Sequence, residues 1–189
     1  MNQIGFEPIF LVGELSLVAL IVILTLVDAF RKPIFTLLSG ENEITSEIES
    51  RNRQTAWIAG IGLLIVAGIY FYFVKATSSA NVSLLHNSLR AGGGIYIGKL
   101  AIVGAGILTI LLSARYTLSQ SIPAGDYYLL LCFSMLGALT LIAAENFLMI
   151  FLALEMMSIP IYALVGLKRY NSRVGESAIK YLLLGGFSS

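Results

Sequence analysis

Five long apolar runs, separated by shorter polar segments, set the pattern of this chain. They cover Ile9–Phe30, Ala56–Val74, Ile95–Ala114, Tyr127–Ala144 and Phe147–Leu167. Each run comes close to the roughly 20 residues that an α-helix needs to cross the hydrocarbon core of a bilayer. The pattern therefore predicts an all-α integral membrane protein, built as a polytopic bundle of transmembrane helices.

A sixth apolar helix is predicted from about Ser177, in the stretch SAIKYLLLGGFSS. This stretch would rise about 20 Å as a helix, which is short of a bilayer core of roughly 30 Å. We therefore expect the sequence to end inside a helix. It is then either a fragment or a chain whose bundle a partner chain completes.

Two long polar segments connect the first three apolar runs. Residues 31–55 form an inner loop that includes ENEITSEIESRNRQ, for which we favour a solvated linker over a short amphipathic surface helix. The segment Lys75–Arg90 is also polar, and we expect it to be irregular. By contrast, only Glu145 and Asn146 separate the fourth run from the fifth, so these two helices should be antiparallel neighbours.

The basic residues of the polar segments favour one orientation in the membrane, because cytoplasmic loops carry an excess of Lys and Arg. One side holds Arg31, Lys32, Arg51, Arg53, Arg115, Lys168, Arg169 and Arg173, and the other holds Lys75 and Arg90. This imbalance predicts that the N-terminus lies outside.

Composition agrees with a membrane protein and excludes several other classes. The chain is 57% hydrophobic and 12% charged, about half the charged fraction of a soluble domain. A net charge of +1 argues against nucleic acid as a partner. With Cys132 as the one cysteine and His86 as the one histidine, a disulfide, a clustered metal site and a bis-histidine haem are excluded within the chain.

Glu155 is the candidate functional residue, since it lies near the middle of the fifth run. A carboxylate at that depth is costly, and intramembrane acids usually mark ion or proton pathways. Pro160 blocks the helical hydrogen bond to the carbonyl of Met156, and Ser158 adds a hydroxyl, so a polar spot is expected here. The alternative is a protonated Glu155 that only hydrogen-bonds a neighbouring helix.

Lys180 lies near the start of the sixth helix, about 4–10 Å inside the inner boundary, whereas Glu155 is roughly 18 Å from it. We therefore expect water or another residue to bridge the two. The alternative for Lys180 is snorkelling to the surface. Glu14 and Lys99 lie near the outer ends of their runs. For Glu14 we favour contact with water over a pair with a neighbouring subunit, and for Lys99 we expect snorkelling to the surface. Aromatic anchors at the interface are expected at Trp57, Tyr127 and Tyr128.

The segment GDYYLLLCFSMLGALTLIAAENFLMIFLALEMMSIPIYALVGLKRYNSRVGESAIKYLLLGGFSS, Gly125–Ser189, resembles the membrane subunits N of NADH-quinone oxidoreductases, the respiratory complex I family. The shared marks are the tyrosine pair, the LE followed by S-P-Y-L-V-G, a basic loop and E-A-I-K-Y-LLLG-FSS. The resemblance implies an antiporter-like fold, with residues 1–124 as three leading helices and 125–189 as the start of the first repeat. It places Glu155 on the family's helix-five glutamate and Lys180 on a lysine of helix six. The family's helix-seven lysine and second repeat have no counterpart in this sequence.

The resemblance also implies a function. Such a subunit translocates protons, while quinone, flavin and iron–sulfur clusters belong to other subunits and none is bound by this chain. Its partners would be other complex I membrane subunits, the lipid bilayer and a chain that supplies the remaining C-terminal helices, and its place the bacterial inner membrane. Two alternatives stay open: a subunit of a multisubunit sodium/proton antiporter, and a structural membrane scaffold without its own channel.

The orientation can be tested by labelling single cysteines introduced at Arg51 and at Lys168 in a variant that lacks Cys132. Both should react with a membrane-impermeant reagent from the cytoplasmic side alone, because both belong to the basic side. Reaction from opposite sides would contradict the predicted topology.

Overall fold

The computed structural model describes residues 11–38, 44–76, 82–84, 88–119, 122–167 and 172–188. Six helices dominate these ranges, with one β-hairpin between the second and the third. The elements are α2 (Val12–Leu38), α3 (Ile44–Ala76), β1 (Val82–Leu84), β2 (Leu89–Ala91), α4 (Gly93–Ser119), α5 (Ala124–Ala143), α6 (Phe147–Val165) and α7 (Ser172–Ser188). Five helices are long and apolar enough to cross a membrane, and α7 has a shorter apolar part, Ala178–Phe187. The predicted all-α polytopic bundle is confirmed.

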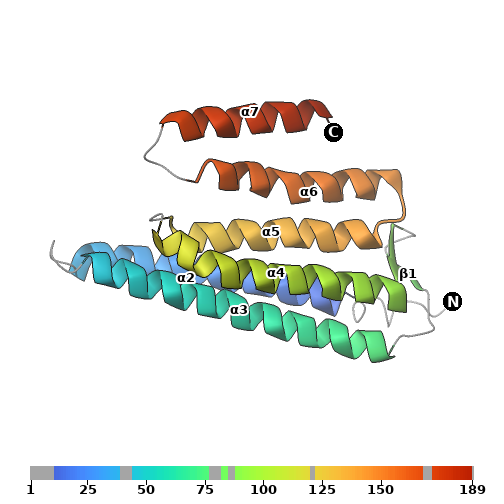
Figure 1. The fold of residues 1–189 in the computed structure, drawn as a ribbon. Coiled ribbons are helices and arrows are strands. Elements are labelled where there is room, and N and C mark those ends of the chain that lie inside the picture. The colour runs from blue at the N-terminus through green and yellow to red at the C-terminus, as the bar shows by residue number, and fades with distance from the viewer. Residues whose placement is uncertain are drawn as a thin grey trace.

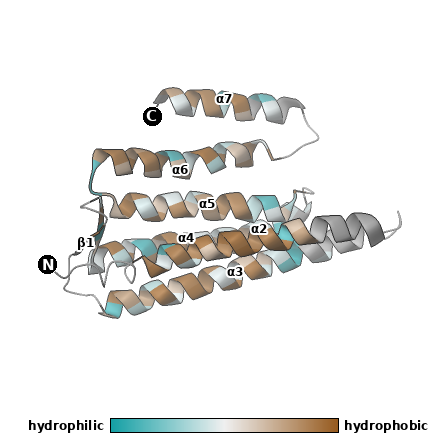
Figure 2. Cartoon of the chain, turned by 180° about the vertical axis from the view of Figure 1, so that it is seen from behind, coloured by the Kyte–Doolittle hydropathy of each residue, from teal (hydrophilic) through white to brown (hydrophobic). Residues whose placement is uncertain are grey.

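The helices lie roughly side by side along one common direction (Figure 1). Helices α2, α3, α4 and α5 pack together as a group, α6 packs against α5, and α7 lies beyond α6. The middle of the bundle is apolar along most helices, and polar residues gather toward the helix ends (Figure 2). This banding is what a bilayer requires of the helices that cross it.

The core of the group α2–α5 consists of apolar residues that recur at helical spacing. They include Leu17 and Leu24 of α2, Ala59, Leu63 and Val66 of α3, Val103 and Ile110 of α4, and Cys132 and Leu139 of α5, all buried. Residues three, four or seven positions apart share one face of a helix, so each helix turns one such stripe toward its neighbours. The opposite faces carry exposed apolar side chains such as Ile65, Leu112 and Phe133.

Two predictions about the polar segments are wrong. Within the predicted loop 31–55, helix α2 continues to Leu38, and helix α3 begins at Ile44 and continues without a break into the span. Residues 31–38 and 44–54 are therefore helical rather than a loop with a solvated linker, and residues 39–43 lie outside the described part. Asn52 and Thr55 face inward there, and the Asn52 amide donates to the Ile122 carbonyl at 3.4 Å. The expected irregular segment between α3 and α4 contains the hairpin β1–β2, in which Val82 pairs with Ala91 and Leu84 with Leu89. Sequence polarity alone misses it, because its anchors come from another part of the chain.

The hairpin is fixed to the turn between α5 and α6. The Glu145 amide donates to the Ser88 carbonyl at 3.0 Å, and the Asn146 side-chain amide donates to the Ser88 hydroxyl at 2.9 Å. Arg90 and Glu145 form an ion pair at 2.7 Å. Leu84, Leu89 and Ala91 are buried beneath these contacts. The hairpin therefore packs against one end of the bundle.

The turn between α5 and α6 is short, and Asn146 caps the start of α6. Its side-chain oxygen accepts a hydrogen bond from the Met149 amide at 2.8 Å. The two helices are antiparallel neighbours, as the short connection predicts. They approach most closely at Gly137. A Cβ there would lie 2.8 Å from the backbone carbon of Met156 and from the Cα of Met157. Small residues allow such close approach of helices in membranes.

Gly137→Ala should therefore destabilise the fold by about 1–3 kcal/mol, because the added methyl group forces α6 away from α5. Thermal unfolding of the purified protein in detergent measures the loss. Gly104→Ala on α4 is the matched control, since a Cβ at Gly104 meets no atom within 4 Å. Equal stability of the two variants would contradict the close contact.

Candidate functional site

Glu155 is the ninth residue of α6, at the middle of the span Phe147–Val165. Helix α6 is the least buried of the five spans, and its buried residues are Ala153 and Pro160. Glu155 itself is half-buried, and its carboxylate makes no ion pair or hydrogen bond with another described residue. The carboxylate is thus free to interact with water or with a group from outside the described helices.

The backbone around Glu155 is polar in the way that the sequence suggests. Pro160 lies inside α6 and has no amide hydrogen to donate to the Met156 carbonyl. The Ser158 hydroxyl lies 2.9 Å from the Leu154 carbonyl and 3.3 Å from that of Glu155, so it also turns back onto the helix. One turn of helix therefore combines a carboxylate, a carbonyl without its usual donor and a hydroxyl.

Ser134 of α5 belongs to this site, and sequence analysis missed it. Its hydroxyl donates to the Met157 carbonyl at 2.9 Å across the α5–α6 contact, one residue after the carbonyl that Pro160 leaves free. Gly137, one turn further along α5, holds the same stretch of α6 at close range. The available signal was a hydroxyl residue in the middle of an apolar span, where polar side chains usually bond to a neighbouring helix.

Lys180 lies on an exposed face of α7 and pairs with Glu176, one turn earlier, at 2.6 Å. Both side chains are about two-thirds exposed, at 67% and 65%. No direct contact joins Lys180 to Glu155 within the described residues, although α7 packs against α6. Glu176 was not singled out from the sequence, but its i,i+4 spacing from Lys180 is the usual spacing of a helical ion pair.

A second pair of intramembrane charges corrects the prediction for the outer helix ends. Lys99 of α4 donates to the Glu14 carboxylate of α2, and Lys99 is only 2% exposed. The expectation that both side chains contact water is therefore wrong, because they pair with each other in the interior. This pair cannot be predicted from the sequence, because its two residues are 85 positions apart. Only the packing of α2, α3 and α4 brings them together.

Two tyrosines complete the surroundings of this pair. The Lys99 ammonium lies 5.8 Å from the ring centre of Tyr70 and 5.5 Å from that of Tyr96, within the range of cation–π attraction. Both rings are fully buried.

Tyr128, expected at the membrane interface, is also fully buried in the core, while Trp57 is 67% exposed. The reason is helical phase: Tyr128 falls on the stripe of α5 that includes Cys132.

The fold and the site together define a polytopic helical membrane protein with an ionisable side chain at mid-span beside a proline. Residues 144–189, which contain Glu155, Pro160 and Lys180, match the family described as NADH:quinone oxidoreductase/Mrp antiporter, TM. The chain is 31% identical over 147 residues to NADH-quinone oxidoreductase subunit N of Paraburkholderia phymatum, and 34% identical over 148 residues to subunit N 1 of Chloroherpeton thalassium. Each alignment covers 77% of this chain and 30% of the relative.

A third relative, subunit N of Salinibacter ruber, is 39% identical over 107 residues, which are 57% of this chain and 21% of that protein. The chain belongs to this subunit N family of antiporter-like membrane proteins, and it spans about 30% of the length of the first two relatives. The resemblance found in Gly125–Ser189 is thus confirmed. Alignments of 147 and 148 residues are longer than that segment, so the similarity also reaches into the leading helices.

The Glu14–Lys99 pair should behave as one unit in stability. Glu14→Gln or Lys99→Met alone leaves a buried charge without its partner and should cost about 3–5 kcal/mol. The double variant Glu14→Gln/Lys99→Met removes both charges and should recover most of that loss. Thermal unfolding of the four proteins gives the coupling free energy.

Lys75→Met is the control for this cycle, because Lys75 is an exposed lysine at the end of α3 and should change stability little. Losses that simply add in the double variant would contradict a coupled pair.

Proposed function

We propose that this chain forms part of a proton-translocating membrane subunit of a complex I-type NAD(P)H- or ferredoxin-quinone oxidoreductase. The observation that carries the proposal is the half-buried Glu155 at the centre of α6, in a segment that matches the antiporter-like family. The division of the sequence into three leading helices (1–124) and the start of an antiporter-like repeat (125–189) is part of the same proposal.

Glu155 would act by taking up and releasing a proton. Proton exchange at a carboxylate responds to nearby charge, so moving a charge toward or away from Glu155 would drive the uptake or release of a proton. The Met156 carbonyl and the Ser158 hydroxyl supply hydrogen-bonding partners for water beside the carboxylate. Ser134 and Gly137 hold this turn of α6 against α5, so that the carboxylate stays at a fixed depth.

Lys180 would act on Glu155 indirectly. It is paired with Glu176 on α7, and α7 packs against α6, so a change in this pair alters the field at the α6–α7 contact without direct bonding. Protons would enter from one side of the membrane and leave toward the other as the surroundings of Glu155 change charge.

The redox chemistry would take place in other subunits, where we expect the quinone, flavin and iron–sulfur clusters. The partners of this chain would then be neighbouring complex I membrane subunits and the helices that complete its own antiporter-like fold. Its setting would be the bacterial inner membrane, with the N-terminus outside. These assignments rest on the family and on the distribution of basic residues.

Two other functions are kept as alternatives. The family description also names the Mrp antiporters, so a subunit of a sodium/proton antiporter has the same support from residues 144–189. Purification together with hydrophilic redox subunits would favour the oxidoreductase. A structural scaffold without a channel is the third reading, and undiminished proton pumping after Glu155→Ala would favour it.

The decisive variants are Glu155→Gln and Glu155→Asp. Glutamine keeps the size and the hydrogen bonds but removes the exchangeable proton, so that variant should assemble and lose most of its proton translocation. Aspartate keeps the charge with a shorter reach and should retain a good part. Membrane vesicles containing the whole assembly report both quantities, with donor oxidation for electron flow and a pH-sensitive dye for pumping. A glutamine variant that pumps like the wild type would end this proposal.

Lys180→Ala serves as the comparison in the same vesicles. It should impair pumping less than Glu155→Gln does, because Lys180 is exposed and water can replace part of its role. Near-complete loss in both variants would show that the two residues are coupled more directly.

A further inference from the structure

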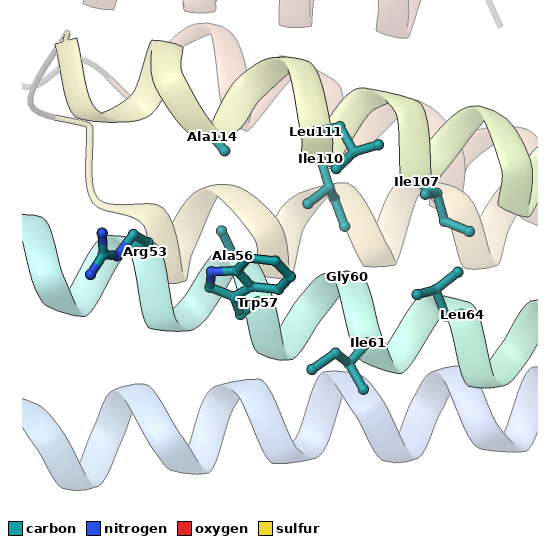
Figure 3. A pocket seen from close by; sticks show the side chains of 10 residues that line it. All are labelled: Arg53, Ala56, Trp57, Gly60, Ile61, Leu64, Ile107, Ile110, Leu111 and Ala114. Atoms are coloured by element: carbon teal, nitrogen blue, oxygen red, sulfur yellow. The ribbon is translucent and has the colours of Figure 1, made fainter.

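An apolar groove runs along the outside of the bundle between α3 and α4, away from Glu155. Its volume is about 360 Å³. One wall is α3 and the other is α4, and Arg53 lies at one end while Leu64 and Ile107 lie at the other (Figure 3). Along α3 the groove is lined by Arg53, Trp57, Gly60 and Leu64.

The length and depth of the groove match one leaflet of a bilayer. Arg53 is the second residue of the span Asn52–Ala76, so it lies at the membrane surface. Leu64 is three turns further along α3, about 16 Å deeper. That distance is roughly half of the 30 Å hydrocarbon core. Gly60 lies between them and has no side chain, which leaves the floor of the groove open.

The chemistry of the groove favours a lipid as its occupant. Its apolar walls and its one charged end match the acyl chain and the headgroup of such a molecule. The side chains along the groove are apolar except at its end, where Arg53 is exposed and has no ion-pair partner among the described residues. Trp57 stands one turn deeper, and indole rings favour the depth of the lipid headgroups.

We propose that this groove binds a phospholipid with an anionic headgroup, whose phosphate lies at Arg53 and whose acyl chain lies along Gly60 toward Leu64. Guanidinium groups bind phosphate through two parallel hydrogen bonds, and basic residues at the cytoplasmic end of transmembrane helices attract anionic lipids. The site is separate from the Glu155 region and does not depend on the proposed proton path.

Trp57 provides the readout, because it is the one tryptophan of the chain and lines the groove. The assembly is reconstituted into phosphatidylcholine vesicles that contain a small, equal fraction of brominated phosphatidylglycerol or brominated phosphatidylcholine. Bromine quenches a nearby indole, and the Trp57→Phe variant supplies the background from other subunits. The anionic lipid should occupy the groove about fivefold better, the factor typical of one basic residue at a membrane surface.

Two pairs of matched variants separate the site from general effects. Arg53→Gln should abolish the headgroup preference, whereas Arg115→Gln, on the same side of the bundle and next to Ala114 in the groove wall, should keep it. Gly60→Leu should fill the groove and reduce quenching by both lipids. Gly68→Leu, on an exposed part of the same helix with no atom within 4 Å of its added Cβ, should leave quenching unchanged.

Several outcomes would overturn the proposal. Equal quenching by the two brominated lipids, or equal loss of preference in Arg53→Gln and Arg115→Gln, would show that no specific headgroup site exists. Absence of any Trp57 quenching in the assembly would show that a protein partner covers the groove instead.

Discussion

A bilayer core offers no water to hydrogen-bond a polar group, so every such group in these helices needs a partner from within the protein. The helical backbone satisfies most of this requirement. Side chains that break the apolar pattern must find partners across helix contacts, and the structure shows two ways of doing so. Ser134 gives its hydrogen bond to a carbonyl of the next helix, and Glu14 and Lys99 neutralise one another in the interior. The Glu155 carboxylate, at mid-span, has no such partner among the described residues, and its candidate role follows from that.

The two halves of the structure meet this constraint differently. Helices α2–α5 bury the Glu14–Lys99 ion pair in a shared core, where the Lys99 ammonium lies near the buried rings of Tyr70 and Tyr96. Helix α6 is the least buried span, and α7 carries an exposed ion pair. Helices α2–α5 thus share a packed core. Glu155, by contrast, lies on the sparsely packed helix α6, where its half-buried carboxylate is accessible to a neighbouring group.

The contact between α5 and α6 links these two parts. Asn146 caps α6 and sets a short turn, and the hairpin β1–β2 is bonded to that turn through Ser88 and Arg90. Gly137 then lets α6 approach within contact of the α5 backbone. Because the packed bundle and the hairpin both fix α6, the depth of Glu155 is set by residues far from it in the sequence.

The sequence by itself determined the spans, the short connection between α5 and α6 and the candidate Glu155, because hydropathy, a missing proline amide and an acid at mid-span are local properties. The family resemblance likewise came from a continuous segment. Only the tertiary structure decided the pairing of Glu14 with Lys99, the bond from Ser134 to α6, the burial of Tyr128 and the hairpin that packs against the bundle. Each of these depends on which faces of separate helices meet, and the spacing of residues along one chain does not specify that.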